Sequence, residues 1–186
     1  MYFQRTPPFL RFLFPDVIWD STGRPQLKLT FDDGPHPEST PLLLEHLDKK
    51  GLKATFFCLG IQAMKHPDLL EDMRNAGHTV ANHGYAHLSG WSTGTQDYMK
   101  DYAEGAREVG APALFRPAYG RITLSQYRLL SSQTDIVGWS HMPGDFDPSV
   151  SDDLLRRRIQ ESIAVDNAML VLHDKPALVQ RLIHAL

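Results

Sequence analysis

The sequence predicts an α/β fold in which helices pack on a parallel β-sheet. Two observations predict it: short apolar runs rich in Val, Ile, Leu, Thr and Phe recur along the chain, and the longer stretches between them show helical periodicity. Such alternation is typical of β-α units, because a helix returns the chain to the starting edge of the sheet before the next parallel strand. The expected strands cover residues 27–31, 53–59, 78–81, 113–115, 134–138 and 168–172.

The expected helices lie between and after these strands. Leucines recur at helical spacing within residues 40–50, and Gly51 just beyond them is a typical helix end. The same periodicity predicts the other helices. They cover residues 67–76, 95–108, 122–132, 151–164 and 175–185.

The composition indicates one soluble globular domain. The chain has 186 residues, of which 42% are hydrophobic and 22% are charged, and no low-complexity linker divides it. A formal net charge of −3 gives no reason to expect nucleic acid or an anionic membrane as a partner. The basic cluster Arg156–Arg158 is short enough to be a solvated helix face. These features do not predict an oligomeric state.

No run of residues is long and apolar enough to span a bilayer. The apolar start of the chain is interrupted by Arg11, and no small-residue cleavage site follows. We therefore expect a cytoplasmic protein, or an extracellular or periplasmic one whose export signal lies outside this sequence. Cys58 is the only cysteine, which excludes an internal disulfide, and its apolar neighbours predict a buried small side chain.

Polar residues gather directly after, or close to, the expected strand ends. The carboxyl ends of parallel strands meet at one edge of a sheet, where α/β proteins build their sites, so we expect these residues to converge. The clusters are Asp32/Asp33, His83/His87, Arg116/Tyr119, Asp145/Asp147 and His173/Asp174.

Asp32 and Asp33 are the most informative pair. They lie where an apolar run meets Gly34 and Pro35, so a turn of the backbone can send the two neighbouring carboxylates in different directions. Chemistry can use such a pair by giving each acid a different task. A solvated Asp-Gly turn is the alternative for this pair taken alone.

His83 and His87 are four residues apart. On one helical turn this spacing places both imidazoles on the same side, within reach of one metal ion, although surface histidines also occur at this spacing by chance. An aspartate from the first strand end would complete the two-nitrogen, one-oxygen ligand set of catalytic zinc sites. Such sites keep positions open for water and substrate.

Four segments occur along the chain in a recognisable order. They are Thr30-Phe31-Asp32-Asp33-Gly34-Pro35, His83-x-x-x-His87, Arg116-Pro117-Ala118-Tyr119-Gly120 and Leu172-His173-Asp174. Together they resemble the motifs of the polysaccharide deacetylase family, also called carbohydrate esterase family 4 or the NodB-homology domain. The resemblance implies a distorted (β/α) barrel, usually of seven strands. It places the catalytic domain at residues 25–186, after an N-terminal extension at residues 1–24.

The resemblance also implies the chemistry of the site. Asp33, His83 and His87 would hold a divalent metal, usually zinc, with cobalt, nickel or manganese as other candidates. Asp32 would be the general base that takes a proton from the attacking water. One acid must therefore bind the metal while its neighbour stays free of it.

Four further roles are implied by the family pattern. Arg116 would pair with Asp32 and keep it ionised. The alternative role for Arg116 is an ordinary ion pair at the surface. Tyr119 would direct its backbone N–H at the oxyanion, while its side chain could serve packing alone. His173 would be the general acid that protonates the leaving amine, and Asp145 would orient it. A histidine that ends a buried strand is otherwise often a hydrogen-bonded core residue.

The sequence departs from the family pattern in two motifs. Gly84 stands where Ser or Thr usually follows the first histidine, so we expect a hydrogen bond that braces the metal loop to be absent. Phe146 replaces the usual Trp, and Met142 replaces an Asp that is frequent there. Asp147 is therefore a second candidate partner for His173.

The function predicted from these motifs is a metal-dependent hydrolase that removes N-acetyl groups from an amino sugar or its polymer, such as chitin oligomers or peptidoglycan, and releases acetate. Hydrolysis of an O-acetyl ester such as acetyl-xylan, or of another small amide, is the first alternative. A non-catalytic saccharide-binding relative is the second, although such a protein has no need for an unligated base. We expect the aromatic rings of Trp19, Trp91 and Tyr98 to pack in the core rather than to stack on sugars.

Overall fold

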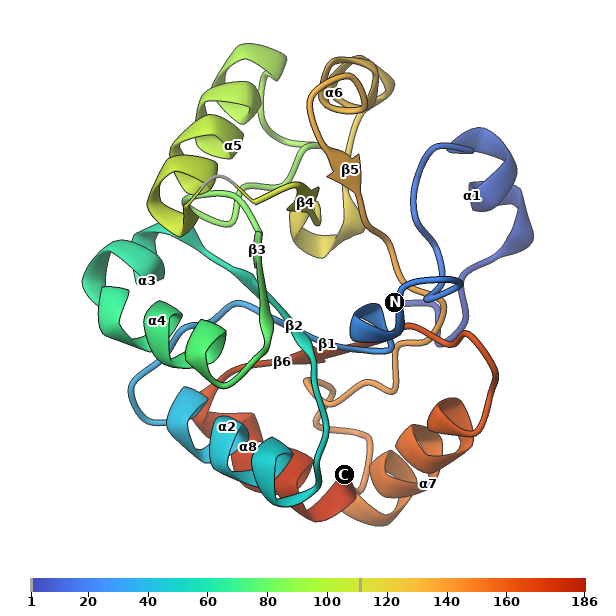
Figure 1. The fold of residues 1–186 in the computed structure, drawn as a ribbon. Coiled ribbons are helices and arrows are strands. Elements are labelled where there is room, and N and C mark those ends of the chain that lie inside the picture. Colours follow the sequence, from blue (N-terminus) through green and yellow to red (C-terminus); the bar gives the residue numbers. More distant parts are fainter. Residues whose placement is uncertain (1, 111) are drawn as a thin grey trace.

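The computed structural model describes residues 2–110 and 112–186, and within them six short parallel strands form one sheet. The strand order across the sheet is β5-β4-β3-β2-β1-β6. Figure 1 shows the strands at the centre of the molecule with helices around them. The strands are β1 (Leu29–Asp32), β2 (Thr55–Cys58), β3 (Thr79–Asn82), β4 (Leu114–Phe115), β5 (Asp135–Ile136) and β6 (Leu170–His173).

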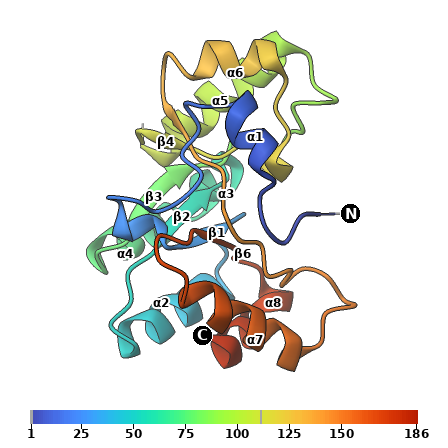
Figure 2. The same ribbon diagram turned by 90° about the vertical axis from the view of Figure 1, so that its right-hand side faces the viewer.

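Helices join successive strands and lie on both sides of the sheet. In the view of Figure 2, α2, α7 and α8 lie below the strands, and α5 and α6 lie above them. No helix in the described residues is long and apolar enough to cross a bilayer. The helices are α1 (Pro8–Leu13), α2 (Thr40–Lys49), α3 (Gly60–Lys65), α4 (Pro67–Asn75), α5 (Thr95–Val109), α6 (Leu124–Leu130), α7 (Asp152–Ile163) and α8 (Pro176–Ala185), with the 3₁₀ turns η1 (Pro25–Leu27) and η2 (Ala118–Gly120).

The predicted α/β order is confirmed. All six expected strands are present within a few residues of their predicted bounds, and the six expected helices are α2 and α4 to α8. The periodicity of the sequence does not reveal α1 and α3, because each has only six residues and completes fewer than two helical turns.

The resemblance implies seven strands, whereas the described residues form six. Residues 140–142 occupy the place beside β6, but they pair with it only through a bridge between His141 and Leu170. Pro143 ends this stretch, and proline has no N–H with which to extend a ladder. The sheet therefore curls but stays open between β5 and β6. A closed barrel would need a further full strand in this place.

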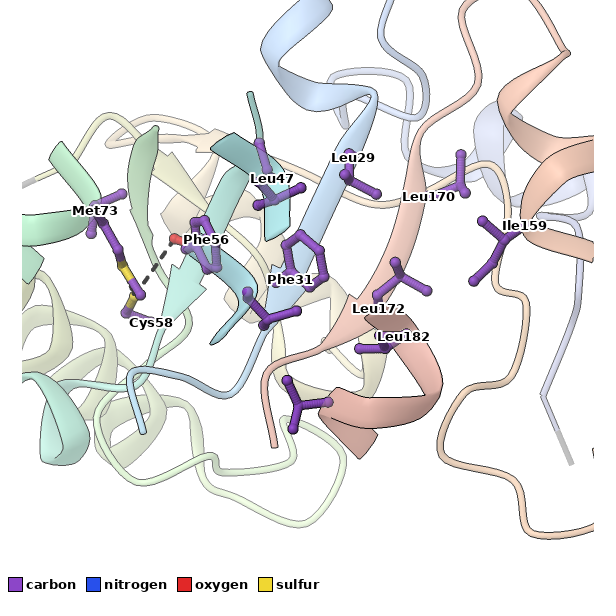
Figure 3. Packing of buried hydrophobic residues seen from close by; sticks show 14 of the residues in the cluster. Leu29, Phe31, Leu47, Phe56, Cys58, Met73, Ile159, Leu170, Leu172 and Leu182 are labelled. Carbon is purple, nitrogen blue, oxygen red and sulfur yellow. Dashed lines mark hydrogen bonds between the residues drawn. The ribbon is translucent and has the colours of Figure 1, made fainter. Parts of the chain in front are cut away.

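One large apolar cluster fixes the central strands against the helices. Phe31 of β1 stacks on Phe56 of β2 with ring centroids 5.1 Å apart. Burial of each large apolar side chain contributes about 1.5–3 kcal/mol, so this layer holds in place the strands that carry the site. Further members of the cluster, labelled in Figure 3, are Leu29, Leu47, Met73, Ile159, Leu170, Leu172 and Leu182.

Cys58 belongs to the same cluster and is fully buried. Burial raises the pKa of its thiol well above the ordinary value, which keeps the sulfur protonated and unreactive. The prediction of a buried small side chain is confirmed. Phe57, the preceding residue, points to the opposite face of the sheet and packs in a smaller cluster with Ala81 and Met169.

The parallel register brings the strand ends to one edge of the sheet. Asp32 at the end of β1 is in register with His173 at the end of β6 and with Phe57 of β2. Asn82 at the end of β3 is in register with Phe115 of β4. The residues that follow these strands therefore leave the sheet side by side.

Candidate metal centre and catalytic cleft

Asp33, His83 and His87 lie together at the carboxyl edge of the sheet. One ligand atom of each lies within 4.8 Å of the other two. The Asp33 Oδ1 atom is 3.1 Å from His87 Nε2 and 3.5 Å from His83 Nε2. It is buried and has no hydrogen bond to any described residue. An unsatisfied buried carboxylate oxygen is costly, so this set of one oxygen and two nitrogens fits a divalent cation.

The backbone explains how two adjacent carboxylates reach different partners. Asp32 lies within β1, whereas Asp33 has a φ of 78°, in the left-handed region that most residues avoid. His87 and Tyr119 also have positive φ values, 60° and 59°. Such conformations cluster at functional sites. At Asp33 the turn sends the side chain toward the histidines.

His83 and His87 do not share a helical turn. Residues 83–87 form a loop after β3, in which Gly84 has a φ of 83° and His87 also has a positive φ. The two ring centroids lie 5.2 Å apart. The expectation of one helical turn is wrong, and it is the bent loop that brings both imidazoles to Asp33.

The surroundings of the three candidate ligands favour the tautomer and the protonation states in which histidine and aspartate bind a metal. The Arg116 carbonyl oxygen lies 2.8 Å from His83 Nδ1, which places the ring proton there and leaves Nε2 free to face Asp33. Burial, with the nearby His83, lowers the pKa of His87 to about 4, so this ring is neutral near pH 7. Burial raises the pKa of Asp33, but His83, His87 and His173 outweigh it and hold this pKa below its ordinary value.

Asp101 of α5 braces the loop that carries the histidines. Its carboxylate accepts hydrogen bonds from the backbone N–H groups of Tyr85 (3.0 Å) and Ala86 (2.8 Å). A Cβ atom at Gly84 would lie 2.5 Å from Asp101 Oδ2, so the glycine makes room for this contact. Gly84 offers no side-chain hydrogen bond, as expected, but a carboxylate from another element braces the loop instead. No motif marks Asp101, because its role depends on how α5 packs against β3.

Asp32 is paired with a fully buried arginine. Arg116 Nη1 donates to Asp32 Oδ1 and to Thr30 Oγ1, each at 2.7 Å, and Nη2 donates to the Gly138 carbonyl oxygen at 2.8 Å. The guanidinium also lies over the Phe57 ring, 4.0 Å from its centroid. Arg116 has no exposed surface, which excludes the alternative of an ordinary surface ion pair. The arginine fixes the orientation of Asp32.

His173 is anchored by Asp145. His173 Nδ1 lies 3.0 Å from Asp145 Oδ1, and its backbone N–H donates to Asp145 Oδ2 at 2.8 Å. Burial lowers the pKa of His173, but the charge and hydrogen bond of Asp145 outweigh it and raise this pKa above its ordinary value. Asp147 instead accepts hydrogen bonds from Ser149. The structure therefore places Asp145, and not Asp147, against His173.

Tyr119 lines the cleft. Its N–H donates no hydrogen bond to any other described residue, and its positive φ holds it in the turn η2. The ring is 58% exposed and lies on His87, with centroids 4.4 Å apart. Gly120 has no Cβ, and one built there would overlap the indole of Trp139. The side chain is thus a surface of the cleft and not a core residue.

Lys175 is a site residue that the motifs do not identify. Its Nζ atom lies 2.8 Å from Asp33 Oδ2, which leaves Oδ1 to face the histidines. The only signal in the sequence is its place directly after the His173-Asp174 motif. Asp174 itself is buried under Ser39 and Thr40, whose hydroxyls each donate to it at 2.5 Å.

The candidate metal ligands, Asp32, His173 and Lys175 lie in the wall of one cleft of about 330 Å³.

Of the aromatic residues expected to pack in the core, Tyr98 is buried and Trp19 is partly buried. Trp91 is 69% exposed, so the expectation is wrong for this residue. The Arg121 guanidinium lies over its ring, 5.1 Å from the centroid. The cleft is lined by Tyr2, Asp32, Asp33, His83, His87, Tyr119, Gly120, Arg121, Trp139, Met142, Phe146, Val171, His173 and Lys175.

The family model for polysaccharide deacetylases matches residues 20–136. A peptidoglycan-N-acetylglucosamine deacetylase of Bacillus cereus is 30% identical over 160 residues, covering 83% of this chain and 58% of that protein. A chitooligosaccharide deacetylase of Rhizobium leguminosarum is 32% identical over 163 residues, covering 83% of this chain and 70% of that protein. The chain thus spans less than two thirds of the length of the first of these relatives.

Solved structures resemble the fold over most of the chain. A crystal structure of a peptidoglycan N-acetylglucosamine deacetylase with a bound benzamide ligand has a TM-score of 0.82 and 29% identity, covering 91% of this chain and 81% of that one. A family 4 carbohydrate esterase from Streptomyces lividans, in complex with acetate, has a TM-score of 0.73 and 29% identity, covering 86% of each chain.

Proposed function

Because the chain belongs to the polysaccharide deacetylase family, we propose that it is a metal-dependent hydrolase that removes acetyl groups from the N-acetylated sugars of a peptidoglycan- or chitin-type polymer and releases acetate. One observation carries the proposal: two adjacent carboxylates have separate partners. Asp33 faces two imidazoles, and Asp32 faces a buried arginine. A hydrolase of this type needs one acid on the metal and one free to accept a proton.

Asp33, His83 and His87 would hold the cation. Their ligand set is typical of catalytic zinc, and cobalt, nickel or manganese are further candidates. When bound, such a cation activates a water molecule and polarises a carbonyl group. The Lys175 ammonium holds Asp33 Oδ2, so this carboxylate would offer the cation a single oxygen.

Asp32 would accept the proton of the attacking water. Its Oδ1 is occupied by Arg116, while Oδ2 lies on the side of His83, 3.9 Å from that Nε2 atom. One oxygen therefore anchors the side chain and the other is available for proton transfer. The Arg116 guanidinium holds this carboxylate in one orientation through a charge-assisted hydrogen bond.

His173 would donate the proton that the leaving amine requires. Asp145 holds Nδ1 and raises the pKa of the ring, which favours the protonated state at neutral pH and points Nε2 away from the anchor. The Tyr119 backbone N–H would donate to the oxyanion that forms on the acetyl carbonyl. An amide needs such an acid because an amine is a poor leaving group until it is protonated.

Acetate release tests this function. The metal-loaded protein is incubated with chitin oligomers, peptidoglycan and acetylated xylan, with elemental analysis of the protein beforehand. We expect one divalent cation per chain and acetate from the first two substrates. Acetate from xylan alone would overturn the proposal in favour of an esterase. Metal without acetate from any substrate would favour a saccharide-binding protein.

A further inference from the structure

Residues 4–6 pair with residues 140–142, which lie beside β6. The Met142 N–H donates to the Gln4 carbonyl oxygen at 2.9 Å, and the Thr6 N–H donates to the Ser140 carbonyl oxygen at 3.2 Å. Figure 2 shows the start of the chain on the same side of the molecule as the loop that precedes α7.

His141 lies between this segment and β6. It forms an antiparallel bridge with Arg5 on one side and a parallel bridge with Leu170 on the other. Backbone pairing therefore continues from β6 through residues 140–142 to the start of the chain. The position of Tyr2 follows from this pairing.

Tyr2 reaches the catalytic cleft. Its ring contacts Phe146 edge to face, with centroids 5.0 Å apart, and Phe146 contacts His173 in the same way at 5.1 Å. The three rings form a row that ends on the residue placed as the general acid. Tyr2 also borders a neighbouring hollow of about 340 Å³ and so forms the wall between it and the cleft.

Gly144 makes room for the Tyr2 hydroxyl. A Cβ built on this glycine would overlap Tyr2 Oη, and its φ of 87° lies in the region that favours glycine. Gly144 comes directly before Asp145, the anchor of His173. The loop that positions His173 is thus shaped on its outer side to receive Tyr2.

We infer that Tyr2 is a positioning residue of the active site, which holds Phe146 against His173 and closes one wall of the cleft. The inference rests on the proposed function, because it assigns Tyr2 a role in that reaction. Phe146 is 40% exposed and has ring contacts on two sides, with Tyr2 and with His173. Without Tyr2 the phenyl ring is free to move into the neighbouring hollow. Asp145 would still hold His173 through its Nδ1 atom and its backbone N–H, but the imidazole would lose its contact with the Phe146 ring.

A double-mutant cycle tests this coupling in the zinc-loaded full chain. The variants are Tyr2→Ala, Phe146→Ala and the combination of both, assayed for acetate release from a chitin oligomer well below the unfolding temperature. Phe3→Ala is the matched control, because Phe3 is the next aromatic residue, is 57% exposed and does not line the cleft.

We expect Tyr2→Ala to lower kcat by about 2- to 10-fold, the range that corresponds to one edge-to-face aromatic contact. Tyr2→Phe keeps the ring and should recover most of the loss. The double variant should be no slower than Phe146→Ala, because Tyr2 acts through Phe146. Equal rates for Tyr2→Ala and Phe3→Ala, or losses that multiply in the double variant, would overturn the inference.

A second measurement does not depend on turnover. The Phe146 ring lies edge to face with the His173 ring, so we expect its ring current to shift the His173 Cε1–H resonance in the NMR spectrum. The signal is assigned by its loss in His173→Gln. We expect Tyr2→Ala to move the resonance in the direction that Phe146→Ala moves it. An unmoved resonance would contradict the contact. If the wild-type protein releases no acetate, the proposed function fails while this resonance still tests the role of Tyr2.

Discussion

Asp32 and Asp33 carry the same functional group one peptide bond apart, and their surroundings give them different chemistry. Asp32 is fixed by the Arg116 guanidinium at 2.7 Å, whereas Asp33 meets two imidazoles and the Lys175 ammonium. A change of φ at a single residue produces the difference, because it turns the second side chain out of the strand. Each carboxylate can therefore be tested separately.

We predict that Asp32→Asn lowers kcat by about 10²- to 10⁴-fold, the usual contribution of a general base. The metal content should stay at the wild-type value, because Asp32 is not among the three ligands. His83→Ala should lose both metal and activity. Elemental analysis and acetate release distinguish the two variants. Wild-type turnover by Asp32→Asn would show that another group is the base.

The second prediction concerns the pH dependence of the reaction. Asp145 raises the pKa of His173, so Asp145→Asn should lower it, and the ring should lose its proton at a lower pH than in the wild type. If His173 is the general acid, the alkaline limb of the profile of kcat/KM against pH moves to lower pH. Asp147→Asn is the control that leaves the limb in place. An unchanged limb in Asp145→Asn would refute the role of the pair.

At the scale of elements, the site depends on how α5 packs on the loop after β3. Asp101 holds two consecutive backbone N–H groups of the loop, and Gly105 of the same helix lies so close that a Cβ there would be 2.5 Å from the Gly84 carbonyl carbon. The Asn82 side chain accepts a further bond from the Gly84 N–H at 2.9 Å. These three hydrogen bonds hold the loop in the bent form in which both histidines face Asp33.

We predict that Asp101→Asn weakens metal binding by about 10- to 100-fold, the usual cost of removing a group that orients a metal ligand. The amide keeps the size of the carboxylate, but only its oxygen can accept a hydrogen bond, whereas both oxygens of Asp101 do so. Competition with a chromophoric chelator measures the affinity. Asp97→Asn, an exposed change on the same helix, is the matched control. Equal affinities in the two variants would remove Asp101 from the site.

For the whole molecule, the cation would join distant parts of the chain. Asp33 follows β1 and the two histidines follow β3, so a bound metal ties these segments together in the folded state only. Ligands that bind the folded state alone stabilise it in proportion to the logarithm of their concentration. Metal binding should therefore appear in the stability of the protein as well as in its activity.

We predict that zinc at about 100 times its Kd stabilises the protein by about 2.7 kcal/mol. For a chain of this size the unfolding temperature should rise by about 5–10 °C. Differential scanning fluorimetry of metal-free and zinc-loaded protein measures the shift, and a chelator should reverse it. His83→Ala should show no rise. A wild-type protein without any rise would contradict the metal site.

The sequence by itself determined the order of strands and helices and the residues at the strand ends, because periodicity and turn residues act over a few neighbours in the chain. Its motifs also predicted the acids, histidines and arginine that the fold brings together in the candidate site. Only the tertiary structure decided how the loop bends at His87, that Asp101 and Lys175 belong to the site, and that six strands curl without closing. It alone brought Tyr2 to Phe146, 144 residues away in sequence. These features depend on contacts between distant segments and on single φ angles, which local patterns do not encode.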